Sequence, residues 1–279
     1  MFSQKQFTRG LLMFFMTVLV IIWLIPLLIT FLTALKTAKE AASSYPWELP
    51  QGFALGENIA WASSRGRLGE SFVQSLIYAG VGSLFAIVLA SLAAFSLVQL
   101  RPVRAFGWFL LIYAGTIFPF QMYLLPLFYL YQTTGLYDTT TGLTLFYTAI
   151  AIPFCLFVLR NHFTTIDYEI IEAAKLDGLS NFGIYRRIYM PLSVAAVAAL
   201  FLFQFTWIWN DLLFGLTLAK SPDVRPIMAG LAGLRGTYSA ANTPGVLAGA
   251  LLASVPTILI FMLLGRYLLR GMTLTTSGE

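Results

Sequence analysis

The chain has 279 residues, of which 58% are hydrophobic and only 10% are charged, and its mean hydropathy is +0.80. A soluble domain carries about a quarter charged residues, so water is not the main solvent of this chain. The formal net charge of +5 does not indicate nucleic acid binding, because the basic residues flank apolar segments and do not form a run.

Chemically reactive side chains are scarce. The chain contains one cysteine, Cys155, and one histidine, His162. A disulfide within the chain and a metal site built from cysteines are therefore excluded, and the usual zinc and acid–base constellations are largely excluded as well. The apolar segments also lack paired carboxylates and an activated nucleophile, so an enzyme is the least favoured class. We expect no catalytic residue, cofactor or metal in this chain.

The first apolar run extends from Leu11 to Ala34 and follows Lys5 and Arg9. A signal peptide also has basic residues before an apolar core, but that core is only about 7 to 15 residues long. This run is long enough to cross a hydrocarbon layer of roughly 30 Å as a helix. It is predicted to be a retained first span, preceded by a cytoplasmic segment at 1–10.

More apolar runs follow, and helices are the natural way to cross lipid because they satisfy their own backbone polar groups. The sequence therefore predicts an all-α polytopic membrane protein with six transmembrane helices. The predicted spans are 11–34, 73–99, 106–131, 142–159, 191–218 and 245–268. They make up one transmembrane domain, 11–272, which is followed by a tail at 273–279. The spans contain four prolines that are predicted to kink them: Pro119, Pro126, Pro153 and Pro256. In the last span, Gly245 and Gly249 form a G-x-x-x-G pair that predicts close helix packing.

The connections between the spans give an expected orientation. The longest lies between the first two spans, and its segment Glu57 to Ser64 is predicted to form a short surface helix. Six spans place both termini on one side, and ten of the 17 basic residues fall on that side against seven on the other. Four of those seven lie in the long connection, where charge constrains topology less: Lys36, Lys39, Arg65 and Arg67. Both termini are therefore predicted to be cytoplasmic.

The connection at 160–190 is polar, charged and too long for a simple turn. Asp167 is predicted to cap a helix that begins at Tyr168, and Gly178 is predicted to end it in the left-handed conformation. Ser180 is then predicted to cap a second short helix that extends through Ile188, and Pro191 marks the start of the fifth span. The loop is thus expected to be a helix, a glycine turn and a helix.

The same loop contains a patterned set of residues. Glu172, Ala173 and Ala174 are followed by three residues and Gly178, then by nine residues and Ile188, then by one residue and Met190-Pro191. This spacing resembles the cytoplasmic loop of permease subunits of ATP-binding-cassette importers, whose pattern is E-A-A, three residues, G, nine residues, I, one residue and L-P. Only the leucine differs, because methionine replaces it here.

The resemblance implies that the first short helix is a coupling helix, which docks into a cleft of a nucleotide-binding subunit and moves as a rigid body. Gly178 would set its angle to the second helix. The residues implied in ATPase coupling are Glu172, Ala173, Ala174, Leu176, Asp177, Gly178, Arg186, Arg187, Ile188 and Pro191. The alternative is a solvated amphipathic helix without a partner.

A narrower resemblance covers nearly the whole chain. It is similar to the carbohydrate-uptake branch of these permeases, in particular to the second, six-span partner of the maltose type. The stretches that agree are Ala34-Leu35-Lys36-Thr37, Asn58, Ser75-Leu76-Ile77, Ala93 to Leu97, Trp209-Asn210-Asp211 and Gly271-Met272-Thr273. The family often ends in a glycine-rich, basic tail, whereas this chain ends in Thr275 to Glu279, which puts a contact between the tail and an ATPase in doubt.

This resemblance implies the partners and the location. They are a second permease, two nucleotide-binding ATPase subunits, an extracytoplasmic solute-binding protein, a sugar or sugar derivative, and the lipid of a bacterial inner membrane. ATP and Mg would be bound by the ATPase partner, because neither Lys36-Thr37 nor Ala219-Lys220-Ser221 follows the glycines of a phosphate-binding loop. The alternatives are a permease of the same kind for glycerol phosphate or another small polar solute, and a secondary transporter that works alone.

Polar side chains inside the spans are candidates for the solute pathway, because they are costly in lipid unless they face a cavity or another helix. Flat aromatic faces and amide or carboxylate groups suit a sugar. The candidates are Gln121 and Tyr123 in the third span, and Gln204, Trp207, Trp209, Asn210 and Asp211 in the fifth. An interfacial aromatic belt, or a contact with the partner permease, remains the alternative.

Overall fold

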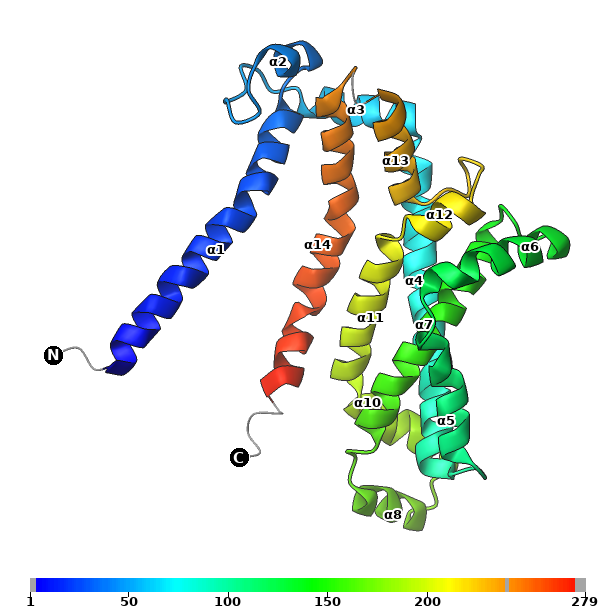
Figure 1. The fold of residues 1–279 in the computed structure, drawn as a ribbon. Coiled ribbons are helices and arrows are strands. Elements are labelled where there is room, and N and C mark those ends of the chain that lie inside the picture. The colour runs from blue at the N-terminus through cyan, green and yellow to red at the C-terminus, as the bar shows by residue number, and fades with distance from the viewer. Residues whose placement is uncertain (1–3, 239–240, 274–279) are drawn as a thin grey trace. The chain divides into compact units, whose positions relative to one another are not determined.

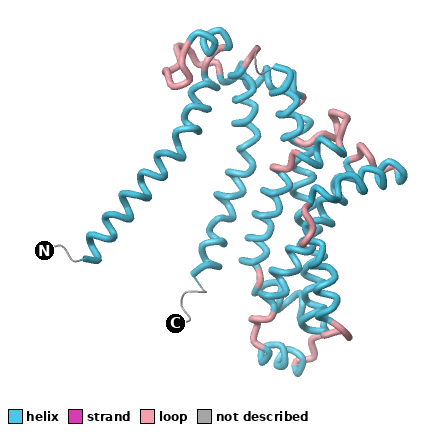
Figure 2. Tube along the Cα trace, in the orientation of Figure 1, coloured by secondary structure: helices cyan, strands magenta, loops and turns pink. Residues whose placement is uncertain are grey.

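The structure is a computed structural model that describes residues 4–238 and 241–273, with side chains described for 8–238 and 241–267. Throughout these residues the chain forms helices and loops (Figure 2), which confirms the predicted all-α class. It divides into two compact units, Met1–Leu68 with Leu231–Ala253, and Gly69–Gly230 with Ser254–Glu279. The predicted tail at 273–279 lies outside the described residues except for its first position.

The first unit contains the amino-terminal helices. They are α1 (Gln4–Leu35), α2 (Ala38–Ser43) and α3 (Leu55–Gly66), joined by the later part of α13 (Ile227–Tyr238) and the beginning of α14 (Thr243–Thr273) (Figure 1). The predicted surface helix in the long connection is thus present as α3. The predicted close packing of the glycine pair is confirmed, because a Cβ atom at Gly245 would lie 2.3 Å from the ring of Trp61 on α3.

The end of α1 is held by a small polar cluster. The Asn58 amide donates hydrogen bonds to the carbonyl oxygens of Ala34 and Lys36, at 2.9 and 2.8 Å. The Lys36 side chain is 1% exposed, and its Nζ donates to Ser44 Oγ and to the Tyr45 carbonyl oxygen. Lys36 therefore stabilises the fold of the connection and does not present its charge at a membrane surface.

The second unit contains the middle of the chain. Its elements begin with α4 (Leu68–Phe95), the π-helix η1 (Ser96–Leu100), α5 (Ala105–Tyr113), the 3-10 turns η2 (Ala114–Thr116) and η3 (Phe120–Tyr123), α6 (Leu124–Thr134) and α7 (Thr140–Phe163). They continue with α8 (Tyr168–Leu176), α9 (Asn181–Ile184), the π-helix η4 (Tyr185–Tyr189), α10 (Met190–Leu192), α11 (Val194–Trp209) and α12 (Leu213–Leu218).

Within the described part of the chain, four helices are long and apolar enough to cross a membrane, and the number rises to six if each of two bent helix pairs is one span. The kink predicted at Pro119 in the third span is a complete break of the helix. The span bends by 89° between Thr116 and Phe120, where Pro119 adopts an extended conformation (ψ 131°). A proline provides no backbone N–H to continue the helix. The fifth span also differs, because it ends at Trp209 and a separate short helix, α12, covers the rest of the predicted range.

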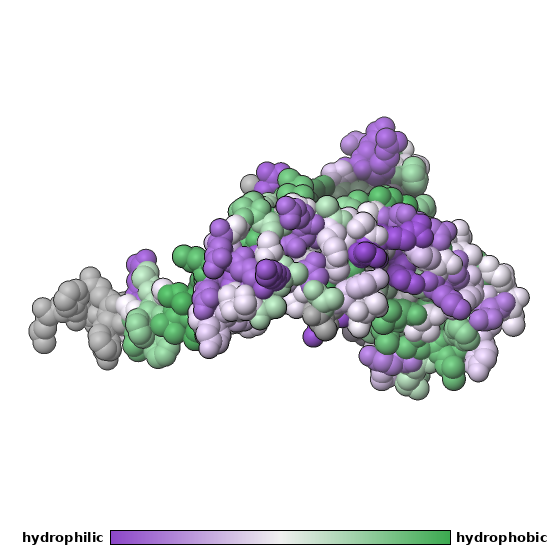
Figure 3. Space-filling view, turned by 90° about the horizontal axis from the view of Figure 1, so that it is seen from above, coloured by the Kyte–Doolittle hydropathy of each residue, from purple (hydrophilic) through white to green (hydrophobic). Residues whose placement is uncertain are grey.

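The outer surfaces of these helices are strongly apolar. Along the central window of α1 no residue is buried within the chain, and its exposed side chains include Phe14, Ile21 and Trp23. At the ends of the helices, hydrophilic side chains, drawn in purple, lie among apolar ones, drawn in green (Figure 3). This distribution suits helices whose flanks are solvated by lipid and whose ends reach water.

Candidate coupling and transport site

The helix α8 lies at one end of the second unit (Figure 1), where it contacts α9. Asp167 occupies its N-cap position, but its side chain makes no capping hydrogen bond, so the predicted side-chain cap is wrong. The predicted end of the helix is confirmed, because Gly178 adopts a φ of +81°, a conformation that costs glycine little. The next prediction also holds, since the Ser180 hydroxyl accepts a hydrogen bond from the Gly183 amide at the start of α9.

The two faces of α8 have different environments. Ile171 is fully buried and Ala174 is 8% exposed, and both belong to an apolar core cluster of the second unit. Glu172 and Ala173 are exposed, and Leu176 is 89% exposed. Ala174 therefore packs inward, and only Ala173 of the alanine pair offers a small side chain for close approach by another molecule.

The rest of the predicted coupling set lies beyond the glycine turn or at the helix end. Asp177, Arg186, Arg187 and Pro191 are exposed, and Ile188 is half-buried. Arg186 and Arg187 lie in the π-helix η4, where the sequence predicts an ordinary helix. The loop thus presents acidic side chains around α8 and basic side chains on η4.

Cationic groups also surround the first residue of α8. The Arg101 guanidinium carbon lies 6.0 Å from the ring centre of Tyr168, and the Lys175 Nζ lies 5.7 Å from it. Contacts at this distance are weak at an exposed site. They still link α8 to the turn after η1, where Arg101 adopts a positive φ of 47°.

Two of the predicted pathway residues share one cavity of about 330 Å³. Gln204 and Trp207 on α11 face Phe120 across it, and the rings of Phe120 and Trp207 are 5.5 Å apart. The other lining residues are Thr116, Ile150, Phe154 and Phe203. The sequence missed Phe120 and Phe154, because a phenylalanine in an apolar span carries no signal that distinguishes a cavity wall from a lipid-facing position.

The other candidates in the fifth span have structural partners. Trp209 is 1% exposed and stacks on Phe205 with ring centres 5.6 Å apart. The Asp211 carboxylate accepts hydrogen bonds from the Tyr147 hydroxyl at 2.8 Å and from the amides of Phe214 and Gly215 at 3.1 Å. Asp211 therefore holds the first turn of α12 against α7. Asn210 is exposed, and its amide donates to the Thr206 carbonyl oxygen.

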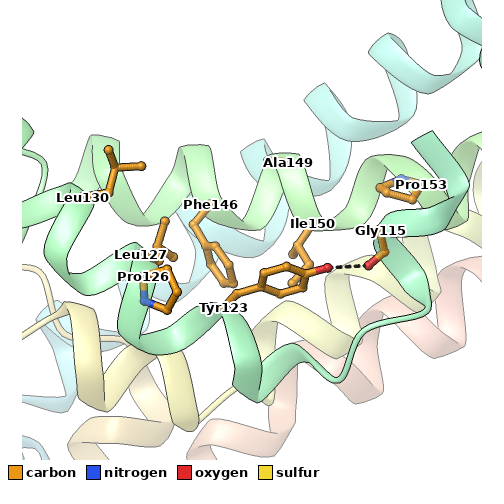
Figure 4. A pocket seen from close by; sticks show the side chains of 9 residues that line it. All are labelled: Gly115, Tyr123, Pro126, Leu127, Leu130, Phe146, Ala149, Ile150 and Pro153. Atoms are coloured by element: carbon orange, nitrogen blue, oxygen red, sulfur yellow. Dashed lines mark hydrogen bonds between the residues drawn. The ribbon is translucent and has the colours of Figure 1, made fainter. Parts of the chain in front are cut away.

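The candidates in the third span lie apart from the Gln204 cavity. Gln121 is exposed. Tyr123 lines a different, largely apolar cavity of about 380 Å³ between α6 and α7, where its hydroxyl donates to the Gly115 carbonyl oxygen at 2.9 Å (Figure 4). The structure therefore does not bring all seven predicted pathway residues together.

A contact between two connections was not predicted. Asp138, which has a φ of +56°, accepts hydrogen bonds from the amides of Lys220 and Ser221 at 2.7 and 2.8 Å and from the Ser221 hydroxyl. Burial alone would raise the pKa of the Asp138 carboxyl, but these hydrogen bonds outweigh it and hold the pKa below its ordinary value. We call this contact the Asp138 clamp. Its partners are 82 and 83 residues away along the chain, so no local pattern reveals it.

No group of three or more histidine, cysteine, aspartate or glutamate side chains that could hold a metal ion occurs in the part of the chain that the structure describes. The cavities and the clamp are formed by aromatic, aliphatic and hydrogen-bonding groups.

Comparison with known proteins defines the class of this molecule. The model of the family described as "Binding-protein-dependent transport system inner membrane component" matches residues 59–274. The chain belongs to this family. It is a multi-pass membrane protein and a permease subunit of an ATP-binding-cassette importer, a transport component and not an enzyme.

Three relatives illustrate the similarity. A probable ABC transporter permease protein of Pyrococcus horikoshii is 39% identical over 175 residues, which are 63% of this chain and 60% of the relative. An osmoprotective compounds uptake permease protein of Synechocystis is 32% identical over 90% of this chain and 86% of the relative. An alpha-glucoside transport system permease protein of Rhizobium meliloti is 34% identical over 80% of this chain and 60% of the relative.

A solved structure has the same fold. One chain of a bacterial ABC transporter involved in the import of the acidic polysaccharide alginate matches with a TM-score of 0.76 and 20% sequence identity, over 96% of this chain and 99% of that chain. The agreement over almost the full length of both chains confirms the predicted importer-permease fold.

Proposed function

We propose that this permease imports a sugar or a sugar derivative across a bacterial inner membrane, together with a second permease, two ATPase subunits and an extracytoplasmic binding protein. The names of the alpha-glucoside relative and of the alginate importer support the solute class. A second alginate importer structure, with a TM-score of 0.66, contains a periplasmic protein bound to an alginate pentasaccharide, which supports a binding-protein partner.

The observation that carries the coupling proposal is the division of α8 into two faces. Ile171 anchors the helix in the core of the second unit, while Glu172, Ala173 and Leu176 are exposed. Leu176 is 89% exposed and lies on the same helix as the small, exposed side chain of Ala173. An exposed apolar surface of this kind is typical of a surface that another protein covers. The ATPase subunit fits this surface, because this chain must receive the energy of ATP from a partner.

ATP and Mg are assigned to that partner because this chain offers no phosphate-binding loop. The buried Lys36 ammonium donates hydrogen bonds to Ser44 Oγ and to the Tyr45 carbonyl oxygen, so it is not available to a phosphate. The backbone amide of Lys220 is held by Asp138. Both lysines that precede a threonine or serine therefore have structural surroundings that do not suit a nucleotide.

The transport cycle that follows is alternating access. Closure of the ATPase pair would push α8, and the second unit would follow because Ile171 and Ala174 lie in its core. The cavity lined by Trp207, Gln204 and Phe120 is the proposed place for the sugar in this chain, because an indole face suits the C–H surface of a sugar ring and an amide suits its hydroxyls. A permease for glycerol phosphate or another small polar solute would use the same coupling surface.

Site-specific photo-cross-linking tests the coupling surface. A photoreactive amino acid at Leu176 should form an adduct with the ATPase subunit in the assembled importer, whereas the same group at Glu57, which is exposed on α3, should not. Glu172→Lys should reduce recovery of the ATPase with the permease by roughly tenfold, because reversing one charge at a protein interface commonly costs more than 1 kcal/mol, and Glu57→Lys is the matched control. Normal assembly and transport with Glu172→Lys, together with no adduct at Leu176, would refute the proposal.

A further inference from the structure

Two π-helices meet at the α8 end of the second unit. The helix α4 continues directly into η1, and α9 continues directly into η4. A π-helix is rare, and such segments are often found at functional sites. Here each segment brings polar side chains to the boundary between α4 and the loop that contains α8.

Two tyrosines of η4 reach across this boundary. The Tyr185 hydroxyl lies 2.7 Å from the Ser91 hydroxyl on α4. Because Ser91 donates its single hydroxyl hydrogen to the Val88 carbonyl oxygen at 2.8 Å, Tyr185 must be the donor to Ser91. The Tyr189 hydroxyl donates to Gln99 Oε1 on η1 at 3.2 Å. The loop is thus hydrogen-bonded to α4 and to its π-helical extension.

Aromatic contacts join the same two elements. Phe95 is the last residue of α4. The centre of its ring lies 5.4 Å from the centre of the Tyr185 ring and 5.1 Å from that of the Tyr189 ring, and both pairs are edge to face. Tyr189 also contacts Phe163 at the end of α7, at 4.9 Å. Edge-to-face pairs of this kind contribute about 0.5–1.5 kcal/mol each beyond the burial of their area.

The link is buried. Ser91 is fully buried, Tyr189 is 2% exposed and Tyr185 is 9% exposed. These residues belong to the same apolar core as Ile171 and Ala174 of α8, apart from Ser91, whose hydroxyl is bonded to that core. Hydrogen bonds are stronger in such a low-dielectric environment than in water, and they fix the relative position of the two elements, which apolar contacts alone would allow to slide.

We propose that Tyr185 and Tyr189 are positioning residues for energy coupling: they lock the loop that contains α8 to the end of α4, so that displacement of α8 moves α4 in the same step. This inference rests on the proposed docking of the ATPase on α8. Without the link, a push on α8 would reach the membrane helices through the chain connection to α11 and through apolar packing. With it, α4 and α11 move together, and the cavity-lining helix α11 cannot shift alone.

The test is the coupling ratio of the full importer in proteoliposomes, measured as solute taken up per ATP hydrolysed. Tyr185→Phe is a clean change, because Ser91 keeps its bond to Val88 and no buried donor is left unpaired. We expect the variant with both Tyr185→Phe and Tyr189→Phe to lower the ratio by about fivefold, which corresponds to the loss of about 1 kcal/mol of hydrogen bonding. The amount of assembled importer and its rate of ATP hydrolysis should stay near those of the parent. Tyr129→Phe, on an exposed residue of α6, is the matched control.

A double-mutant cycle separates coupling from mere stability. If Tyr185 acts through Ser91, adding Ser91→Ala to Tyr185→Phe should lower the coupling ratio no further. An unchanged ratio in the double tyrosine variant would overturn the link while leaving docking on α8 intact. A parallel fall of uptake, ATP hydrolysis and assembled importer would also overturn it, because it would show a structural role only. Failure of docking itself would appear separately, as absence of the adduct at Leu176 in the parent importer.

Discussion

Single side chains fix the connections of this permease. Asp138 is the clearest case, because three hydrogen bonds from two neighbouring residues converge on one carboxylate. Hydrogen bonds to a charged group are worth about 1.5–3 kcal/mol each when buried, and less when water competes. Because the Asp138 clamp is half-exposed, its hydrogen bonds contribute less than this to the stability of the whole protein. Their main effect is to hold the 219–226 connection in one conformation.

Asp138→Ala should release this connection. Trypsin can cleave the peptide bond after Lys220, which is exposed. The backbone amides of Lys220 and Ser221 both donate hydrogen bonds to Asp138. Cleavage at this bond should become roughly tenfold faster when those hydrogen bonds are lost. The fragment is identified by mass after limited trypsin digestion of the purified protein. Asp138→Asn keeps a carbonyl oxygen for the two amides and should show an intermediate rate. Equal cleavage in all three proteins would show that the clamp does not order the connection.

The clamp also predicts a pH dependence with a defined sign. The pKa of the Asp138 carboxyl is lower in the folded protein than its ordinary value of 3.8. Its contribution to stability is therefore fully present above pH 3.8 and is lost as the pH falls through the folded pKa. Near neutral pH the clamp is therefore fully formed, so cleavage after Lys220, measured relative to an unstructured reference peptide to correct for the pH dependence of trypsin, should not change with pH in the parent protein.

At the same scale, the sequence predicted residue types better than residue partners. Gly245 was correctly expected to pack closely, since glycine spacing reports helix approach. Asp211 was named as a candidate for the solute pathway, and its carboxylate is bonded to Tyr147 and to the backbone of α12. Those partners become visible only when the chain folds, because Tyr147 is 64 residues away.

At the scale of elements, the glycine turn after α8 determines how α8 and α9 of the 160–190 loop are arranged. Gly178 has a φ of +81°, and a Cβ atom there would meet nothing within 4 Å. A substitution at this position is therefore opposed by backbone conformation and not by crowding. Left-handed backbone costs an ordinary residue about 1–2 kcal/mol, and asparagine adopts it more readily than most residues.

Substitutions at Gly178 should follow that order. Gly178→Asn should retain uptake close to that of the parent, Gly178→Val should lower it several-fold, and Gly178→Pro should abolish it, because proline cannot adopt a positive φ. Uptake and recovery of the ATPase are measured in the same membranes, and the level of inserted permease is the control. Full uptake by Gly178→Pro would show that the angle between α8 and α9 does not matter.

The long helices were predictable because their apolar length is a property of the local sequence. The spans expected at 11–34 and 73–99 correspond to α1 and α4, and α4 continues as η1. A kink at Pro119 was expected, but the full interruption of the helix there was not, because the composition stays apolar on both sides and a proline can either kink or interrupt a membrane helix. The helix α13 was missed because its alanines and glycines give no clear apolar face.

At the scale of the whole molecule, the coupling proposal depends on sidedness. If each bent pair crosses the membrane once, six spans follow, and the connections that contain Glu57 and Glu172 must lie on opposite sides. The excess of basic residues on the side of the termini predicts that Glu172 faces the cytoplasm. An ATPase that uses cytoplasmic ATP could reach α8 only in this orientation.

Cysteine labelling in intact cells tests that orientation. Glu57→Cys should react with a membrane-impermeant maleimide added outside, whereas Glu172→Cys should react only after the membrane is permeabilised. Both positions are exposed, and the background should be low because Cys155 is fully buried. The parent protein, which contains Cys155 alone, is the control. Labelling of Glu172→Cys from outside would place α8 on the wrong face for an ATPase, and neither docking on Leu176 nor transmission through Tyr185 could then operate.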